Sequence, residues 1–397
     1  MTSAPPLPKP SLLRRRSAKR AEPSGSPAKR PRLYALDGMR LFAALSVLSF
    51  HWTAYVGIGG IWSPGHTPKE VLPLLNRMAA YGWLGVELFF VISGFVICMS
   101  CWGKRSGEFF VSRVVRLYPA YWAGIALTSF VVLTFTRYAR SGADEGLNLR
   151  TILGNLTMMQ TPIGMRHVDG VYWTLWVEMR FYLLFALVVA MGLTYRRVVA
   201  FCGIWTILAL LAPQAGIPLL TTMVMPNESP FFIAGVGMFL MYRFGQNLLL
   251  WGIVGFSWIL ALTRLDSIKG IYVNVLNHQL SWSVMAVAVT AAFALVLGAA
   301  LGLFDWVQWK WLTVAGALTY PLYLIHQEAG WTVIHFLLTK HFSVQAALAT
   351  ALAAVLLTAW LIHRLVERPV SKVLKGALDR SIATMRKTSD EPAPGKP

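Results

Sequence analysis

Charge is scarce in this chain. Asp, Glu, Lys and Arg supply 13% of the 397 residues, about half of the roughly 25% that is typical of soluble domains. Hydrophobic residues supply 56%, and no break in the apolar pattern is long enough to separate soluble domains. The 16 Trp and 13 Tyr are suited to the aromatic belts at the two surfaces of a membrane. The composition therefore argues against a soluble globular protein and favours one membrane-embedded unit.

Cysteine is almost absent, with three residues in the whole chain. Cys98 and Cys101 form a single CxxC pair, and Cys202 stands alone. A zinc site would need a second pair of Cys or His residues at a suitable spacing. We therefore predict buried free thiols and no metal.

Acidic residues are scarcer than basic ones, 17 against 36, and the net charge is +19. Much of the excess lies at the two ends, in residues 1–34 and in the residues after His363. Neither end has the interleaved aromatics of a nucleic-acid stacking platform, so we predict no nucleic-acid partner. Basic segments beside membrane helices set topology or contact anionic lipid. We predict a disordered basic cytoplasmic tail at 1–33, a membrane domain at 34–372 and a second cytoplasmic tail at 373–397.

Long apolar runs predict the architecture. A secretory signal peptide is the alternative for the first run, but its apolar region spans about 7–15 residues, whereas this run continues through "SFHWTAYVGIGGIW". A spanning helix needs about 20 apolar residues. Ten segments are candidates: 36–56, 82–102, 117–136, 171–193, 198–213, 229–243, 247–263, 283–304, 312–338 and 345–364. The prediction is an all-α bundle of about ten transmembrane helices in the inner (plasma) membrane, with both basic tails cytoplasmic.

The first predicted span carries two ionisable residues, Arg40 and His51, in "DGMRLFAALSVLSFHW". Eleven steps of 100° complete three turns plus about 20°, so an ideal helix places both on one face, roughly 16 Å apart along the axis. Ionisable groups inside spans are rare and usually functional. The structural alternative is that Arg40 reaches lipid headgroups while His51 bonds a neighbouring carbonyl.

Two arginines recur one turn apart in "FFVSRVVRLYPAYW", where Arg113 and Arg116 precede Pro119. Since Pro is favoured in the first turn of a helix, we expect the third span to begin near this Pro. Paired guanidinium groups at the inner mouth of a span suit a phosphate-bearing ligand as well as lipid headgroups.

Further ionisable residues interrupt apolar segments elsewhere. Glu178 lies in "YWTLWVEMRFYLL", Glu87 in "GVELFFVISGFVI", and His326 with Glu328 in "YPLYLIHQEAGW". Each alone could belong to a structural pair, but several in one bundle indicate a polar cavity within the membrane.

These motifs, in this order and closed by "ERP" at Glu367–Pro369, resemble the acyltransferase-3 family of integral-membrane O-acyltransferases over about residues 33–372. The resemblance implies a ten-helix bundle that transfers an acyl group from cytoplasmic acyl-CoA to a hydroxyl group, usually on a carbohydrate or a glycosylated molecule. By position, His51 matches the essential histidine of the first helix, and Arg40 its partner.

The resemblance also implies roles for residues on later spans. Arg113 and Arg116 match the basic pair near the coenzyme, and Glu178 matches the first acid of the fourth-helix motif. Many relatives carry a second acid and a Gln after it, where this chain has Met179 and Arg180. We assign His51, Arg40 and Glu178 to catalysis and Arg113, Arg116 and Arg40 to the coenzyme. Expected contacts to the acceptor are Glu87, Tyr172, Trp173, Trp176 and His326.

The residues support this chemistry independently. O-acylation needs a base for the hydroxyl proton, and imidazole titrates in the right range. Direct attack on the thioester and a transient acyl-histidine both fit. A proton-coupled transporter or exporter could use the same charged cavity without bond chemistry, and a receptor or lipid-binding scaffold is a third class.

The acceptor stays open at this stage. Polysaccharide, peptidoglycan sugar, glycolipid and a macrolide-type natural product all carry suitable hydroxyl groups. Acyl chain length, the side of the membrane on which the acceptor is modified and homo-oligomerisation also stay open.

Overall fold

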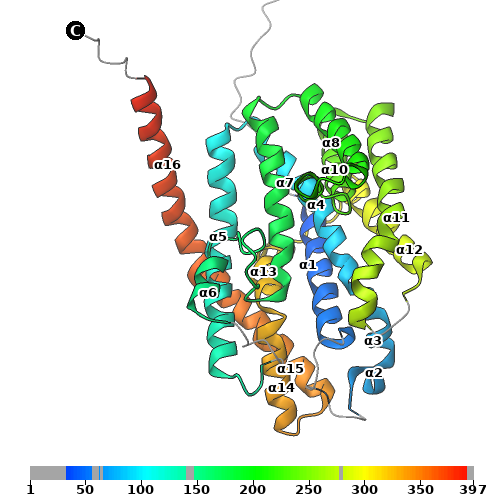
Figure 1. The fold of residues 1–397 in the computed structure, drawn as a ribbon, viewed down its shortest axis with the longest axis vertical. Helices are drawn as coiled ribbons and strands as arrows, with labels where there is room; N and C mark the ends of the chain where they lie inside the picture. Colours follow the sequence, from blue (N-terminus) through cyan, green and yellow to red (C-terminus); the bar gives the residue numbers. More distant parts are fainter. Residues whose placement is uncertain (1–32, 56–61, 63–65, 140–146, 277–279, 391–397) are drawn as a thin grey trace, which may run out of the picture. The chain divides into compact units, whose positions relative to one another are not determined.

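A computed structural model describes residues 33–55, 62, 66–139, 147–276 and 280–390. The predicted disordered tail at 1–33 falls outside the described residues, apart from Leu33. Leu33–Pro397 forms one compact unit, and its described part is helical, with no strand (Figure 1). The helices are α1 (Tyr34–Ser49), α2 (Pro68–Val71), α3 (Pro73–Ala79), α4 (Gly85–Cys101), α5 (Ser106–Thr134), α6 (Leu149–Asn155), α7 (Trp173–Ala190), α8 (Tyr195–Ala215), α9 (Pro218–Val224), α10 (Ser229–Phe244), α11 (Leu248–Leu276), α12 (Trp282–Ala300), α13 (Trp311–Ile325), α14 (Glu328–Thr339), α15 (Val344–Leu361) and α16 (Arg368–Asp390).

Short non-α turns extend several of these helices. The 3₁₀ turns are η2 (Gly82–Leu84) and η3 (Gly170–Tyr172), and the π-helical turns are η1 (Phe50–Ala54) and η4 (Ile362–Glu367). Both π turns continue an α-helix directly, η1 after α1 and η4 after α15. Each therefore changes the direction in which the following side chains project.

The prediction of an all-α membrane bundle is confirmed. Among the described residues, seven helices are long and apolar enough to cross a membrane. The other predicted spans fall on α1, α10 and α13, which have 16, 16 and 15 residues. The total of ten stays a prediction.

Several predicted span boundaries differ from the structure, among them the end of the seventh span, predicted at 263, since α11 continues to Leu276. The third span begins at Ser106, well before 117, and Pro119 lies inside α5. Arg113 and Arg116 therefore lie on the helix itself, one turn apart. The predicted span 312–338 is broken, because α13 ends at Ile325 and α14 begins at Glu328.

Glycines allow the central helices to pack closely. A Cβ atom at Gly94 of α4 would overlap the backbone carbonyl of Phe232, and one at Gly235 of α10 would overlap that of Val91. Small residues at helix contacts are typical of membrane bundles, where burial of apolar surface gives little association energy. Such a contact holds α4 and α10 at the centre of the bundle.

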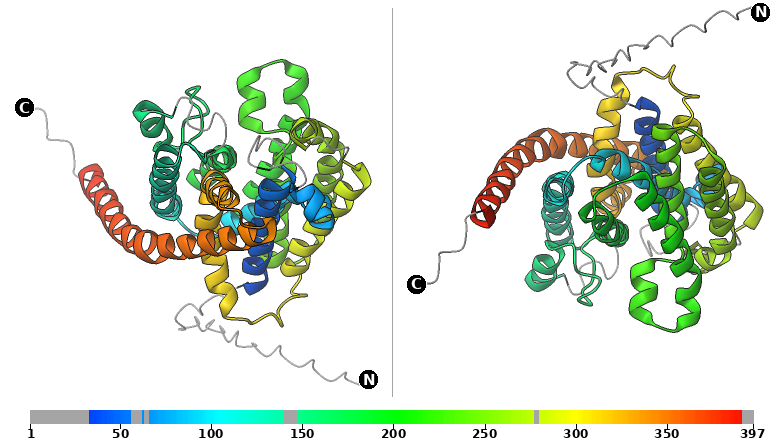
Figure 2. Two further views of the ribbon diagram at one scale, coloured as in Figure 1. Left: turned by 90° about the horizontal axis from the view of Figure 1, so that it is seen from below. Right: turned by 90° about the horizontal axis from the view of Figure 1, so that it is seen from above.

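The last helix leaves the bundle. α16 follows α15 through η4 and curves along the outside of the bundle, with α5 as its neighbour, and both views in Figure 2 show its curved path. In Figure 1 its far end lies toward the top, whereas α2, α3 and α14 lie toward the bottom.

Candidate active site

His51 lies on the π-helical turn that continues α1. The backbone N–H of Tyr55 donates to the Phe50 carbonyl at 2.9 Å, five residues earlier, which closes the wide turn. Such turns are rare and occur frequently at functional sites. Regular α-helical geometry ends at Ser49, because the π turn starts at Phe50. The distance and angle calculated for Arg40 and His51 on an ideal helix therefore hold only approximately for His51.

His326 lies at the break between α13 and α14. Buried Asp169 stabilises the new helix start, since its carboxylate accepts from the backbone N–H of Glu328 at 3.2 Å and from that of Val171 at 3.2 Å. A carboxylate at a helix N-terminus satisfies N–H groups that have no partner within the helix. The break therefore places a histidine at a helix end inside the bundle.

The two histidines are in contact. His51 Nδ1 lies 3.0 Å from His326 Nε2, and His326 Nδ1 lies 2.7 Å from the Tyr323 carbonyl oxygen. A carbonyl oxygen only accepts, so His326 Nδ1 carries the proton of its bond. With both rings neutral, His326 Nε2 accepts from His51 Nδ1. This chain of bonds leaves the lone pair of His51 on Nε2.

Two indoles lock the pair in place. Trp52 Nε1 donates to the His326 carbonyl at 2.7 Å, and Trp331 Nε1 donates to the His51 carbonyl at 2.9 Å. Each histidine backbone is thus held by a tryptophan from the opposite segment. Gly330 is needed for this arrangement, because a Cβ there would come within 2.8 Å of the Trp52 ring. Tyr55 stacks on Trp331 with ring centroids 5.5 Å apart.

The predicted coenzyme residues gather in a second cluster. Arg40 Nη1 lies 3.8 Å from Asp37 Oδ1. The Arg40 guanidinium also interacts electrostatically with Arg116 and Glu178. Glu178 accepts from Ser93 Oγ at 2.7 Å. Arg113 donates to Ser100 Oγ at 3.1 Å and lies over the rings of Phe109 and Tyr182. The structure therefore brings Arg40, Arg116 and Glu178 together, with Arg113 and Arg116 both near Tyr182.

One face of α13 connects the two clusters. Tyr320, Tyr323 and His326 recur every three residues, which places them along a single stripe of a helix. Tyr320 interacts electrostatically with Glu178 and Arg116, and Tyr323 with Glu178. The Tyr323 ring centroid lies 5.5 Å from that of His326. The stripe spans about 9 Å along the helix axis.

Glu87 belongs to a third group of polar side chains. It is 4% exposed, and its Oε2 has no hydrogen-bond partner among the described residues. It interacts electrostatically with Glu228. Tyr272 of α11 interacts with both acids, and also with Tyr323 and Tyr55 beside the histidine pair. The Tyr272 ring centroid lies 5.7 Å from that of Phe50, the residue before His51.

The three predicted aromatic contacts lie elsewhere. Tyr172 is buried with its ring centroid 5.1 Å from that of Tyr121 on α5. Trp176 lies under the Arg180 guanidinium, and Trp173 is 37% exposed. Tyr172 thus packs against α5 and Trp176 against Arg180, and the acceptor role of the three residues stays a prediction.

Sequence reasoning missed several residues of this site. Four aromatic residues carried no signal in the sequence. They occupy apolar segments like many other aromatics: Trp52, Tyr272, Tyr323 and Trp331. Asp169 carried a usable signal, since an Asp before Gly170 is typical of a turn that caps a helix. As predicted, Cys98, Cys101 and Cys202 are buried free thiols. No group of three or more His, Cys, Asp and Glu in the described residues could hold a metal ion.

The fold and these clusters define a multi-pass membrane protein with a part-buried histidine pair and a separate basic cluster. The chain matches the acyltransferase domain of the acyltransferase-3 family over residues 33–364 and belongs to that family. No solved structure matches the chain.

Three curated relatives are similar to part of it. "Nodulation protein 10" of Rhizobium leguminosarum bv. viciae is 28% identical over 188 residues, 41% of this chain and 45% of that protein. "Putative peptidoglycan O-acetyltransferase YrhL" of Bacillus subtilis (strain 168) is 27% identical over 176 residues, 40% of this chain and 24% of that protein. "Acyltransferase MdmB" of Streptomyces mycarofaciens is 26% identical over 159 residues, 39% of each. The chain thus spans less than half the length of each relative.

Proposed function

We propose that this acyltransferase moves an acyl group from acyl-CoA to a hydroxyl group of a carbohydrate or glycosylated acceptor, with His51 as the general base. The observation that carries the proposal is the His51–His326 contact, whose bonds to the Tyr323 carbonyl keep the lone pair on His51 Nε2. A base needs such a defined tautomer within reach of the hydroxyl.

The transfer step uses this lone pair. His51 Nε2 takes the proton of the acceptor hydroxyl while the hydroxyl oxygen attacks the thioester carbonyl. The C–S bond breaks, and the coenzyme leaves as a thiolate that takes the proton back from the imidazolium. The positive charge on His51 is stabilised through its Nδ1–H bond to His326. If the acyl group instead moved to Nε2 first, mass spectrometry of the rapidly quenched protein would find acylated His51.

The basic cluster is suited to the coenzyme. Arg40, Arg113 and Arg116 can hold its phosphates, since guanidinium groups bind phosphate oxygens in pairs. The α13 stripe then gives the pantetheine arm a direction toward His326. Both tails lie in the cytoplasm in this proposal, because the clustered Lys and Arg of 9–32 and 364–396 obey the positive-inside rule.

The acceptor is proposed to lie near Glu87. A buried carboxylate oxygen without a partner among the described residues needs a donor, and a sugar hydroxyl supplies one. Tyr272 interacts electrostatically with Glu87, and its ring centroid lies 5.7 Å from that of Phe50, the residue before His51, which supports an acceptor position near both. Two relatives are named for peptidoglycan O-acetylation and for acyl transfer, which supports a hydroxyl acceptor.

His51→Ala tests the proposal. It should leave CoA binding within a few-fold and lower thiol release from acetyl-CoA, measured with cell-envelope extract as acceptor, by roughly 10²- to 10⁴-fold. His335→Ala is the matched control, because His335 is also partly buried and its Nδ1 lies 3.0 Å from the Tyr138 carbonyl oxygen. Normal thiol release by folded His51→Ala would refute the base, whereas consumption of acetyl-CoA by the wild type would argue against a transporter, which does not consume its acyl donor.

A further inference from the structure

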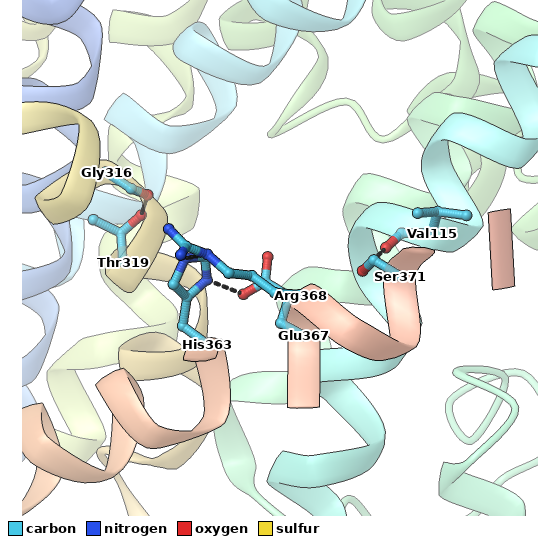
Figure 3. A network of polar contacts seen from close by, with 7 residues as sticks. All are labelled: Val115, Gly316, Thr319, His363, Glu367, Arg368 and Ser371. Atoms are coloured by element: carbon cyan, nitrogen blue, oxygen red, sulfur yellow. Dashed lines mark hydrogen bonds and ion pairs between the residues drawn. The ribbon is translucent and has the colours of Figure 1, made fainter. Parts of the chain in front are cut away.

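The junction between α15 and α16 is an elbow held by three side chains (Figure 3). His363 Nδ1 donates to Glu367 Oε2 at 2.8 Å, and Arg368 Nε donates to His363 Nε2 at 3.1 Å. Pro369 follows, and proline has no N–H to continue the helical ladder. The π turn η4 absorbs this interruption. The elbow therefore sets the direction in which α16 leaves the bundle.

That direction places α16 along the first half of α5. Ser371 Oγ donates to the Val115 carbonyl at 3.0 Å (Figure 3). Further out, the Ile382 side chain lies against Gly107, where a Cβ would come within 3.1 Å of its Cδ1. The two helices thus run antiparallel. Lys375 lies between these two contacts, on the stretch of α16 that faces the turn of Arg113.

Lys104 has two cationic neighbours near these contacts. Lys104, in the loop before α5, interacts electrostatically with Arg113 and with Lys375. Burial and the neighbouring Arg113 lower the pKa of the Lys104 ammonium. The Glu108 carboxylate also interacts with Lys104, and within the described part of the chain Lys104, Arg113 and Lys375 form no ion pair.

Like charges held together destabilise a fold unless an anion joins them. We propose that Lys104, Arg113 and Lys375 form a phosphate-binding site that α16 completes, and that it holds a phosphate of the coenzyme. Coenzyme A carries a diphosphate and a ribose phosphate, more negative charge than Arg40 and Arg116 alone can neutralise. The choice of coenzyme rests on the proposed function, whereas the phosphate site rests on the three cations.

A phospholipid headgroup has the same chemistry, so the test separates the two sources. Full-length protein in phosphatidylcholine nanodiscs is titrated with coenzyme A by calorimetry. Lys375→Glu and Lys104→Gln should each weaken coenzyme A binding by about ten-fold, because each removes one charged contact to phosphate. Arg113→Ala should weaken coenzyme A binding by a similar factor. Inorganic diphosphate should compete with coenzyme A in the wild type.

Arg380→Glu is the matched control, because it changes the charge of α16 by the same amount as Lys375→Glu. Arg380 lies about 140° around the helix from Lys375 and donates to the Gly376 carbonyl of its own helix at 3.2 Å. Its coenzyme affinity should stay within two-fold of the wild type. Size-exclusion chromatography checks folding, and Lys375→Gln, which adds no negative charge, replaces Lys375→Glu if the latter does not fold.

The second arm compares melting temperatures in discs with and without phosphatidylglycerol. If Lys375→Glu removes a stabilisation by phosphatidylglycerol but keeps the affinity for coenzyme A, the site holds a lipid phosphate. If neither measurement responds, or if Arg380→Glu has the same effect, there is no phosphate site at α16. Since no arm measures acyl transfer, these outcomes are independent of the His51→Ala test.

Discussion

Replacement of His326 tests whether the histidine pair works as a unit. His326 is 1% exposed and accepts the His51 Nδ1–H bond at 3.0 Å. Its role in the proposal is to position His51, since its own Nδ1 is engaged by the Tyr323 carbonyl at 2.7 Å. His326→Phe keeps an aromatic ring of similar size and removes the acceptor for His51.

The magnitude follows from the charge that develops on His51. When Nε2 takes the proton, Nδ1–H belongs to an imidazolium, and its bond to His326 becomes charge-assisted. Hydrogen bonds to charged groups contribute about 1.5–3 kcal/mol, which corresponds to roughly a ten- to 150-fold loss in kcat. Rotation of the released His51 ring would add to this loss, because the lone pair would leave its position.

The assay is thiol release from acetyl-CoA per folded molecule, with kcat and KM separated. His326→Phe should lower kcat and leave the KM for acetyl-CoA within two-fold, because the basic cluster is untouched. His326→Gln should recover part of kcat, since its amide oxygen can accept from His51 Nδ1. A folded His326→Phe enzyme with kcat within two-fold of the wild type would show that the pair is structural.

Two further predictions concern packing and topology. Gly235→Ala should destabilise the protein by about 1–3 kcal/mol, because its Cβ would overlap the Val91 carbonyl, whereas Gly252→Ala on α11, with no atom within 4 Å of its Cβ, should not lower the melting temperature in detergent. Reporter fusions at the two chain ends should both report the cytoplasm, as the basic segments at 9–32 and 364–396 predict, and opposite locations would contradict this topology.

Much of the site could be predicted because charge in an apolar run is conspicuous. Arg40, His51, Glu178 and Glu87 interrupt hydrophobic segments, and Arg113 with Arg116 repeats at one helical turn. The pairing of these residues could not be predicted in the same way. Sequence spacing relates residues on one helix, whereas His51 and His326 are 275 positions apart. Their contact depends on how α1 and α13 pack.

Local irregularities were equally invisible in the apolar pattern. The π turn at Phe50–Ala54 and the break after Ile325 contain polar residues, but neither carries a Pro or Gly at the point of change that would indicate an altered helix. Both depend on tertiary partners: Trp331 on the His51 carbonyl, and Asp169 on the N–H of Glu328.

By itself, then, the sequence determined that the protein is embedded in lipid, that it is all-α, and which reactive side chains lie in its apolar segments. Composition and run length decide that the helices face lipid, and the family motifs place imidazole and guanidinium groups inside them. Only the tertiary structure decided that His51 and His326 are in contact, that Tyr272 interacts with Glu87, and that α16 brings Lys375 near Lys104. The physical reason is that a hydrogen bond or a charge interaction depends on distances of a few ångströms between helices, which helix periodicity does not encode.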